Sequence, residues 1–184
     1  MLDLFNKLTN INISGTVKKQ DIVKDISGCI AESGYTVTEL NDEKPWGAYY
    51  RFGDGDEERF LDEFFPGLGL ENGVMGEESC GLSLKILLVS PGSQSLSWQY
   101  HNRRKEVWAY ITEGGYRRSM SDEESELFTA ISGDVIQFEP QERHRLVGNS
   151  TQYTIVAEVW QHTDPNRLSD EDDIVRVKDD YNRE

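Results

Sequence analysis

Apolar residues change their spacing along this chain, from a helical repeat near the N-terminus to short runs after residue 82. Within 20–33 they recur every three or four positions, which places them on one face of a helix. These apolar residues are Ile22, Val23, Ile26, Cys29 and Ile30. Gly34 follows where such a helix would end. The pattern therefore predicts a helix over 20–33, whereas the weak periodicity of 1–19 predicts a loosely attached arm.

The rest of the chain has the pattern of an all-β domain. Turn signals such as Pro91-Gly92, Gly114-Gly115 and Gly148-Asn149 separate short apolar runs. Strands are expected at 35–40, 48–52, 82–90, 94–101, 106–112, 116–120, 125–129, 135–139, 144–148 and 152–160. Short strands at a spacing of roughly 8–12 residues favour a sandwich or barrel. We therefore expect a barrel over 44–184, with 1–43 forming an arm and a short N-terminal helix that pack on it.

Two segments depart from this pattern of short strands and turns. Residues 53–81 form a long excursion with a short helix expected over 59–65, and a loop of this length in a compact domain is often functional or partly structured. Residues 169–184 are acidic and are expected to pack as a tail. Either 1–43 or 53–81 could form a lid.

The bulk composition narrows the function classes. A chain of 184 residues with 36 % hydrophobic and 29 % charged residues favours one globular domain. The formal net charge of −15 argues against nucleic acid or an anionic membrane as a partner, although a local arginine cluster could still hold a small anion. No run approaches the roughly 20 apolar residues of a membrane span, and no secretory signal is recognised. Cys29 and Cys80 lack close spacing, so a reduced, cytoplasmic setting is expected.

Two of the three histidines fall in expected strands beside other metal-ligating side chains. Gln99 and His101 are two residues apart in a strand, so their side chains share a face. Glu106 begins the next strand, where a hairpin would return its carboxylate beside that pair, and His144 could close the ring. An amide oxygen, two imidazoles and a carboxylate suit one divalent ion, with Zn²⁺ favoured and Mn²⁺, Fe²⁺, Co²⁺ or Ni²⁺ possible. A single strand histidine is more often an ordinary core residue, so the prediction depends on the combination.

Four motifs follow one another over roughly 44–181: Lys44-Pro-Trp-Gly47, the segment 92–108 around Gln99, the segment 133–146, and the segment 172–181. Together they resemble the type II mannose-6-phosphate isomerases of the cupin superfamily. In that resemblance 92–108 and 133–146 match the first and second cupin motifs, and Gln99 replaces the first histidine of the general cupin pair. The segments 44–47 and 172–181 match the family's N-terminal motif and C-terminal ending. The resemblance implies a cupin fold, which is a double-stranded β-helix or jelly-roll barrel. Asn102, Arg103 and Val107 depart from the family, which usually has histidines there; a related branch with arginines at this place is often labelled phosphoheptose isomerase.

The resemblance also implies a reaction, the conversion of mannose 6-phosphate to fructose 6-phosphate through a cis-enediol. The metal would polarise the substrate oxygens, and a side chain must carry the proton. Glu158, Glu142 and Lys85 are candidates for that role; Glu158 lies in an apolar strand, where burial would raise its pKa.

Arginines are the natural ligands for the substrate phosphate. Arg145 follows His144 and matches the family's His-Arg-Leu, although strand alternation turns it away from that histidine. Arg103 shares the parity of Gln99 and His101, and Arg104 is a weaker candidate. Trp108 and Tyr110 share the parity of Glu106 and are expected to line the cavity.

Two other functions stay open at this stage. A non-catalytic cupin would bind a phosphorylated sugar without turnover, and a cupin oxygenase would use Fe²⁺ and consume oxygen. By analogy with stand-alone cupins that pair through exposed edge strands, a homodimer is also expected.

Overall fold

A computed structural model describes residues 3–68, 82–164 and 166–181 of the chain. Its helices are α1 (Asp3–Thr9), α2 (Lys19–Glu32) and α3 (Glu57–Phe64). Its strands are β1 (Val37–Asn41), β2 (Gly47–Phe52), β3 (Ser83–Val89), β4 (Trp98–Tyr100), β5 (Arg104–Tyr110), β6 (Gly114–Ser119), β7 (Phe128–Ala130), β8 (Val135–Phe138), β9 (Arg143–Val147), β10 (Thr154–His162) and β11 (Val175–Lys178).

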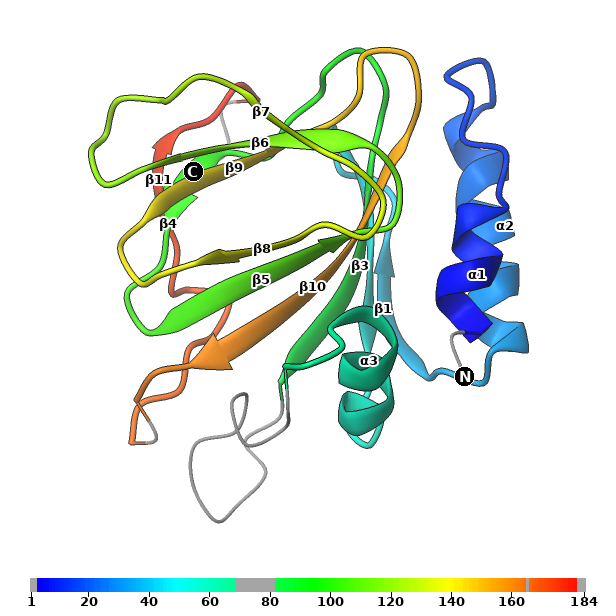
Figure 1. Ribbon diagram of the computed structural model, residues 1–184, viewed down its shortest axis with the longest axis horizontal. Coiled ribbons are helices and arrows are strands. Elements are labelled where there is room, and N and C mark those ends of the chain that lie inside the picture. The colour runs from blue at the N-terminus through cyan, green and yellow to red at the C-terminus, as the bar shows by residue number, and fades with distance from the viewer. Residues whose placement is uncertain (1–2, 69–81, 165, 182–184) are drawn as a thin grey trace.

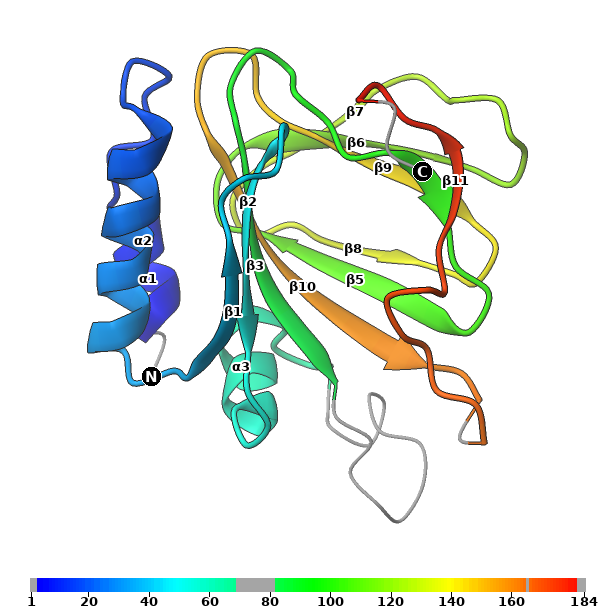
Figure 2. The same ribbon diagram turned by 180° about the vertical axis from the view of Figure 1, so that it is seen from behind.

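The strands form two antiparallel sheets that face each other as a barrel (Figures 1 and 2). The larger sheet has the order β1-β2-β3-β10-β5-β8, and the smaller has the order β11-β4-β9-β6-β7. Each sheet therefore combines strands that lie far apart in the sequence, as in a jelly roll. The expected all-β fold with few helices is confirmed.

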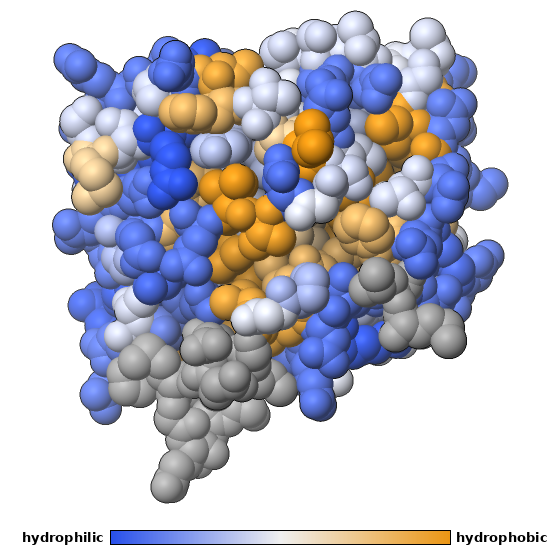
Figure 3. All heavy atoms as spheres, in the orientation of Figure 1, coloured by the Kyte–Doolittle hydropathy of each residue, from blue (hydrophilic) through white to orange (hydrophobic). Residues whose placement is uncertain are grey.

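The middle strands β3, β10 and β5 of the larger sheet are buried on both faces, because helices cover one face and the smaller sheet covers the other. Ile155, Ala157 and Val159 of β10 belong to the core cluster that includes residues of all three helices. Val156, between them in sequence, belongs to the inner cluster with Trp108. Strand alternation thus sorts neighbouring residues of one strand into two cores. Figure 3 shows apolar side chains gathered in the middle of the face onto which the barrel opens in Figure 1.

The expectation of a loose arm over 1–19 is wrong. Leu4 and Leu8 of α1 are fully buried, because α1 packs against α2 and α3. The buried carboxylate of Glu63 joins these elements, since it accepts hydrogen bonds from the Phe5 amide at 2.8 Å and from the Tyr35 hydroxyl at 2.7 Å. Seven helical residues are too few to show a clear period, but two leucines four positions apart suffice to dock them.

The other expected elements are found with shifted ends. The helix expected at 20–33 is α2, and that at 59–65 is α3. The strand expected from residue 94 begins only at Trp98. The acidic tail contains β11, which pairs with β4. The remaining part of the 53–81 excursion, residues 69–81 with Cys80, lies outside the described residues.

No helix among the described residues combines the length and apolar character needed to cross a membrane.

Replacing Leu8 by Ala tests whether α1 is integral to the fold. The variant leaves a cavity between three helices, so we expect the free energy of unfolding to fall by about 2–5 kcal/mol. Urea denaturation measures this change. Leu40→Ala, at an exposed position of β1, is the control and should change stability by less than about 0.5 kcal/mol. Equal, small effects in both variants would contradict the docking of α1.

Candidate metal centre

Three strands and one turn bring the predicted ligands together. Gln99 of β4 and His144 of β9 are direct partners in the smaller sheet. His101 follows the last residue of β4, and Glu106 reaches it from β5 in the larger sheet. The site therefore lies between the two sheets, inside the barrel.

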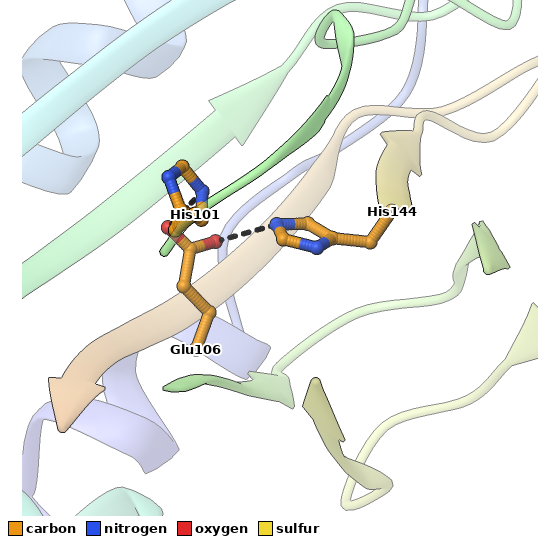
Figure 4. A group of neighbouring side chains, drawn as sticks. All are labelled: His101, Glu106 and His144. Atoms are coloured by element: carbon orange, nitrogen blue, oxygen red, sulfur yellow. Dashed lines mark hydrogen bonds and ion pairs between the residues drawn. The ribbon is translucent and has the colours of Figure 1, made fainter. Parts of the chain in front are cut away.

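The side chains of His101, Glu106 and His144 converge at this point (Figure 4). The Nε2 atom of His101 lies 2.9 Å from Oε1 of Glu106, and Nε2 of His144 lies 3.1 Å from Oε2. All three side chains are buried. Adjacent ligands at right angles, each about 2.1 Å from an ion, would be about 3.0 Å apart, so these separations fit a metal site.

Backbone carbonyls fix the tautomers of both imidazoles. Nδ1 of His101 lies 2.5 Å from the Asp173 carbonyl oxygen, and Nδ1 of His144 lies 2.9 Å from the Glu142 carbonyl oxygen. A carbonyl only accepts, so each Nδ1 carries the hydrogen and each Nε2 presents a lone pair. Two nitrogen lone pairs thus face the two oxygens of one carboxylate. These groups repel one another, and a cation bound between them would remove the repulsion. This group can hold a metal ion.

Gln99 adjoins this group from the side of Ser97. Its Nε2 lies 3.5 Å from His101 Nε2, and its Oε1 accepts from the Ser97 hydroxyl at 2.5 Å. Turning the amide over would present its oxygen to the cluster, with the Ser97 hydroxyl accepting from its nitrogen.

Arg104 also reaches the cluster. Its guanidinium donates to Glu106 Oε1 through Nε at 3.1 Å and Nη2 at 2.8 Å, and Nη2 lies 3.2 Å from His101 Nε2. Nη1 bonds to the Ser169 hydroxyl and the Asp170 carbonyl, and the group stacks 3.4 Å from the centre of the Trp160 ring. Its donors are used by protein groups, so Arg104 positions Glu106.

Burial and charge set the protonation of the two central ligands. Burial lowers the pKa of His101 more than Glu106 raises it, so the neutral ring is favoured. Burial alone would raise the pKa of Glu106, but its neighbours, among them the charged Arg104, hold that pKa well below its ordinary value. A neutral imidazole and an ionised carboxylate are the forms that bind metal.

A second pair of ionisable groups lies on the inner face of the larger sheet. The Glu158 carboxylate accepts hydrogen bonds from the indoles of Trp108 at 3.2 Å and Trp160 at 3.1 Å, and Lys85 Nζ lies 3.8 Å away. Burial raises the pKa of Glu158, the charge of Glu106 adds to this effect, and Lys85 opposes it. Burial lowers the pKa of Lys85 to about 8 against the attraction of Glu158.

Glu106 of the metal-ligating group and the pair Lys85–Glu158 line one cavity of about 140 Å³. The ligand candidate Gln99 also lines it. The other charged residues of its wall are Lys44, Arg104, Glu171 and Arg176. The cavity is therefore a polar chamber that places Glu106 and the acid–base pair on one wall.

Four of the predicted side chains have other partners. Arg145, on the opposite face of β9 from His144, pairs with Asp180 at 3.0 Å and with Glu124 at 3.4 Å. Arg103 pairs with Asp170 at 3.1 Å. The Glu142 carboxylate accepts from Arg118, and the Tyr110 hydroxyl donates to the Gly115 carbonyl. All four side chains therefore have partners away from the metal-ligating group.

Sequence reasoning missed the contribution of 169–174. The Asp173 carbonyl orients His101, while its carboxylate accepts from the amides of Asn102 and Arg103. Glu171 reaches Lys85 and Arg51 at the mouth of the cavity. The only local signal was an acidic run, which by itself is typical of a solvated tail.

No family model matches this sequence, and no curated protein matches it. Solved structures do resemble it. A cupin 2 conserved barrel domain protein from Salinispora arenicola is 17 % identical over 70 % of this chain and 83 % of its own, with a TM-score of 0.44. A Klebsiella pneumoniae protein with a double-stranded β-helix domain is 16 % identical over 53 % and 76 %, with a TM-score of 0.42. An oxalate decarboxylase is 16 % identical over 76 % of this chain but 30 % of its own, with a TM-score of 0.49.

These neighbours are cupin and double-stranded β-helix proteins, whereas this chain's own two facing antiparallel sheets show an all-β barrel. The comparisons do not show a relation to mannose-6-phosphate isomerases.

Replacing His101 or His144 by Ala should abolish tight Zn²⁺ binding, because each removes a lone pair from the centre. Wild-type protein should bind one equivalent and gain about 2.7 kcal/mol of stability at a free Zn²⁺ concentration of 100 times the dissociation constant. Calorimetric titration and thermal melts measure both effects. The control is His162→Gln, because that buried histidine accepts from the Ser169 amide instead. Unchanged Zn²⁺ binding in the two Ala variants would rule out this centre.

Proposed function

We propose that this chain is a metal-dependent sugar-phosphate isomerase, with mannose 6-phosphate and fructose 6-phosphate as the preferred pair. The observation that carries the proposal is the shared cavity, which is lined by Glu106 of the metal-ligating group and by the Lys85–Glu158 pair. Aldose–ketose interconversion requires both components, one for the oxygens and one for the proton at carbon. The four motifs resembling type II mannose-6-phosphate isomerases support the choice of sugar.

The side chains of Gln99, His101, Glu106 and His144 would hold the ion, and Zn²⁺ suits this mixed donor set. A divalent ion there would supply Lewis-acid polarisation of the substrate oxygens. Arg104 keeps Glu106 ionised and correctly oriented through its two bonds to Oε1.

Glu158 is the residue that moves the proton. Glu158 is paired with Trp108 across two strands, and Glu106 with Trp160, so the two carboxylates project on the same face from neighbouring positions. Two indoles hold the Glu158 carboxylate, and burial raises its pKa toward the range of a useful base. In our proposal it takes the proton from C2 of the aldose and returns it to C1.

Lys85 supplies a positive charge beside that carboxylate. Its ammonium stacks on the Trp160 ring at 4.0 Å and lies between Glu158 and the cavity mouth. A buried cation at this place favours a substrate that carries negative charge. This matches a phosphorylated sugar in a chain whose overall charge is −15.

The homodimer and the cytoplasmic location stay predictions. Exposed Leu127, Phe128 and Val135 lie on or beside β7 and β8, the edge strands of the two sheets. Light scattering at micromolar concentration tests the dimer, and a single monomer mass would contradict it.

A coupled assay for fructose 6-phosphate formation from mannose 6-phosphate tests the function. Protein stripped with chelator should be inactive and should regain turnover with Zn²⁺, Mn²⁺, Co²⁺ or Fe²⁺. Glu158→Gln should lower kcat by about 10²–10⁴-fold, because the amide keeps the indole contacts but accepts no proton. Glu123→Gln, on the exposed loop before β7, is the control.

Full metal binding without turnover of any sugar phosphate would contradict the isomerase proposal. Oxygen uptake with Fe²⁺ would then favour an oxygenase. Binding of a sugar phosphate without turnover would favour the non-catalytic cupin.

The pH profile tests the role of Lys85. Its pKa of about 8 means that the ammonium is present below that pH and is lost as the pH rises through it. We therefore expect kcat/KM to fall above about pH 8, mainly through a rising KM for the anionic substrate. Lys85→Arg keeps its charge and should move this decline to higher pH. The same alkaline decline in both proteins would show that another group causes it.

A further inference from the structure

One carboxylate stands at the mouth of the cavity between two cations. Oε1 of Glu171 lies 3.1 Å from Lys85 Nζ and also pairs with the Arg51 guanidinium. The Glu171 side chain is 58 % exposed, whereas that of Lys85 is 9 % exposed. An exposed carboxylate therefore covers a buried ammonium from the solvent side.

Lys85 is surrounded by charges from every element packed against it. Glu158 of β10 lies on the inner side and Glu171 on the outer side, while Arg51 comes from β2. Arg104 and Glu106 of β5 act from farther away. If the Glu171 side chain swings out, Lys85 and Arg51 both lose one anionic partner at the same point.

The backbone beside Glu171 is anchored independently of its side chain. The Asp173 carboxylate accepts from the Asn102 amide, the Arg103 amide and the Ser169 hydroxyl, and β11 pairs with β4 immediately afterwards. The Glu171 side chain can therefore leave the two cations without moving the carbonyl that orients His101.

The charges that line the cavity favour an external anion in the place of the Glu171 carboxylate. Lys44, Lys85, Arg104 and Arg176 line it, against three carboxylates that include Glu171 itself. Without Glu171 the lining holds four cations and two carboxylates, and Arg51 adjoins them at the mouth.

We propose that Arg51 and Lys85 form the subsite for a phosphomonoester, and that Glu171 is an internal competitor that the phosphate displaces. The proposal rests on the proposed function for the identity of the sugar, but not for the anion. A phosphomonoester carries up to two charges and three acceptor oxygens, whereas the carboxylate carries one charge and two oxygens. Exchange therefore strengthens the contacts of both cations, and the exposed Glu171 returns to water at little cost.

A simple surface ion pair makes a different prediction. If Glu171 only ties the 169–174 segment to the sheet, its removal lowers stability slightly and gains no anion affinity. If it competes with phosphate, its removal tightens anion binding.

Calorimetric titration of the chelator-treated full chain separates these cases without any turnover. The probes are inorganic phosphate and mannose 6-phosphate, at low ionic strength and a pH below 8. Glu171→Gln should bind both about ten-fold more tightly than wild-type protein. Asp172→Asn is the matched control, because it removes the same charge from the neighbouring exposed position. Adding Lys85→Met or Arg51→Met to Glu171→Gln should remove the gain.

Three results would overturn the subsite: unchanged affinity in Glu171→Gln, an equal gain in Asp172→Asn, or a gain that survives both cation replacements. A gain for inorganic phosphate but not for the sugar phosphate would overturn it as a substrate site. Because the binding is read without metal or turnover, a protein that shows the gain but isomerises no sugar retains the subsite and loses only the proposed function. Thermal melts of each variant confirm that it is folded.

Discussion

The site depends on two nitrogen lone pairs being turned toward one carboxylate. Neither imidazole would be held in that tautomer by Glu106 alone, because Glu106 would equally accept a proton-bearing Nε2. The carbonyls of Asp173 and Glu142 select the tautomer, because each accepts a hydrogen bond from Nδ1–H. Glu106 in turn is held by Arg104, whose guanidinium is clamped between Trp160 and the backbone at Asp170. The cluster is thus preorganised by groups that do not ligate.

The larger sheet supports this arrangement by having two different faces. Its outer face packs apolar residues of β2, β3, β5 and β10 into one core with the helices, and their burial favours folding. The inner face includes polar residues among tryptophans, since the indoles of Trp108 and Trp160 both find an acceptor in Glu158. The same rings that pack the inner core also hold the acid–base residue.

Local sequence rules predicted most of the site because its geometry follows strand alternation. The shared face of Gln99 and His101, the return of Glu106 and the outward direction of Arg145 all come from a period of two. The same rule misplaced Arg103. Strand alternation ends with β4 at Tyr100 and begins again with β5 at Arg104, so Arg103 lies in the turn between them. Partners 72 and 86 residues apart could not be predicted at all: no local pattern shows that Asp173 meets His101 or that Glu171 meets Lys85. The α1 helix was missed because two buried leucines carry too little periodicity.

The Asp173 carbonyl that orients His101 also ties the site to a distant part of the chain. The two residues are 72 positions apart, so their hydrogen bond closes a long loop. The Nδ1 hydrogen of His101 meets this acceptor only when the segment around Asp173 is in place. The metal-binding form of His101 is therefore a property of the folded barrel and not of the local sequence.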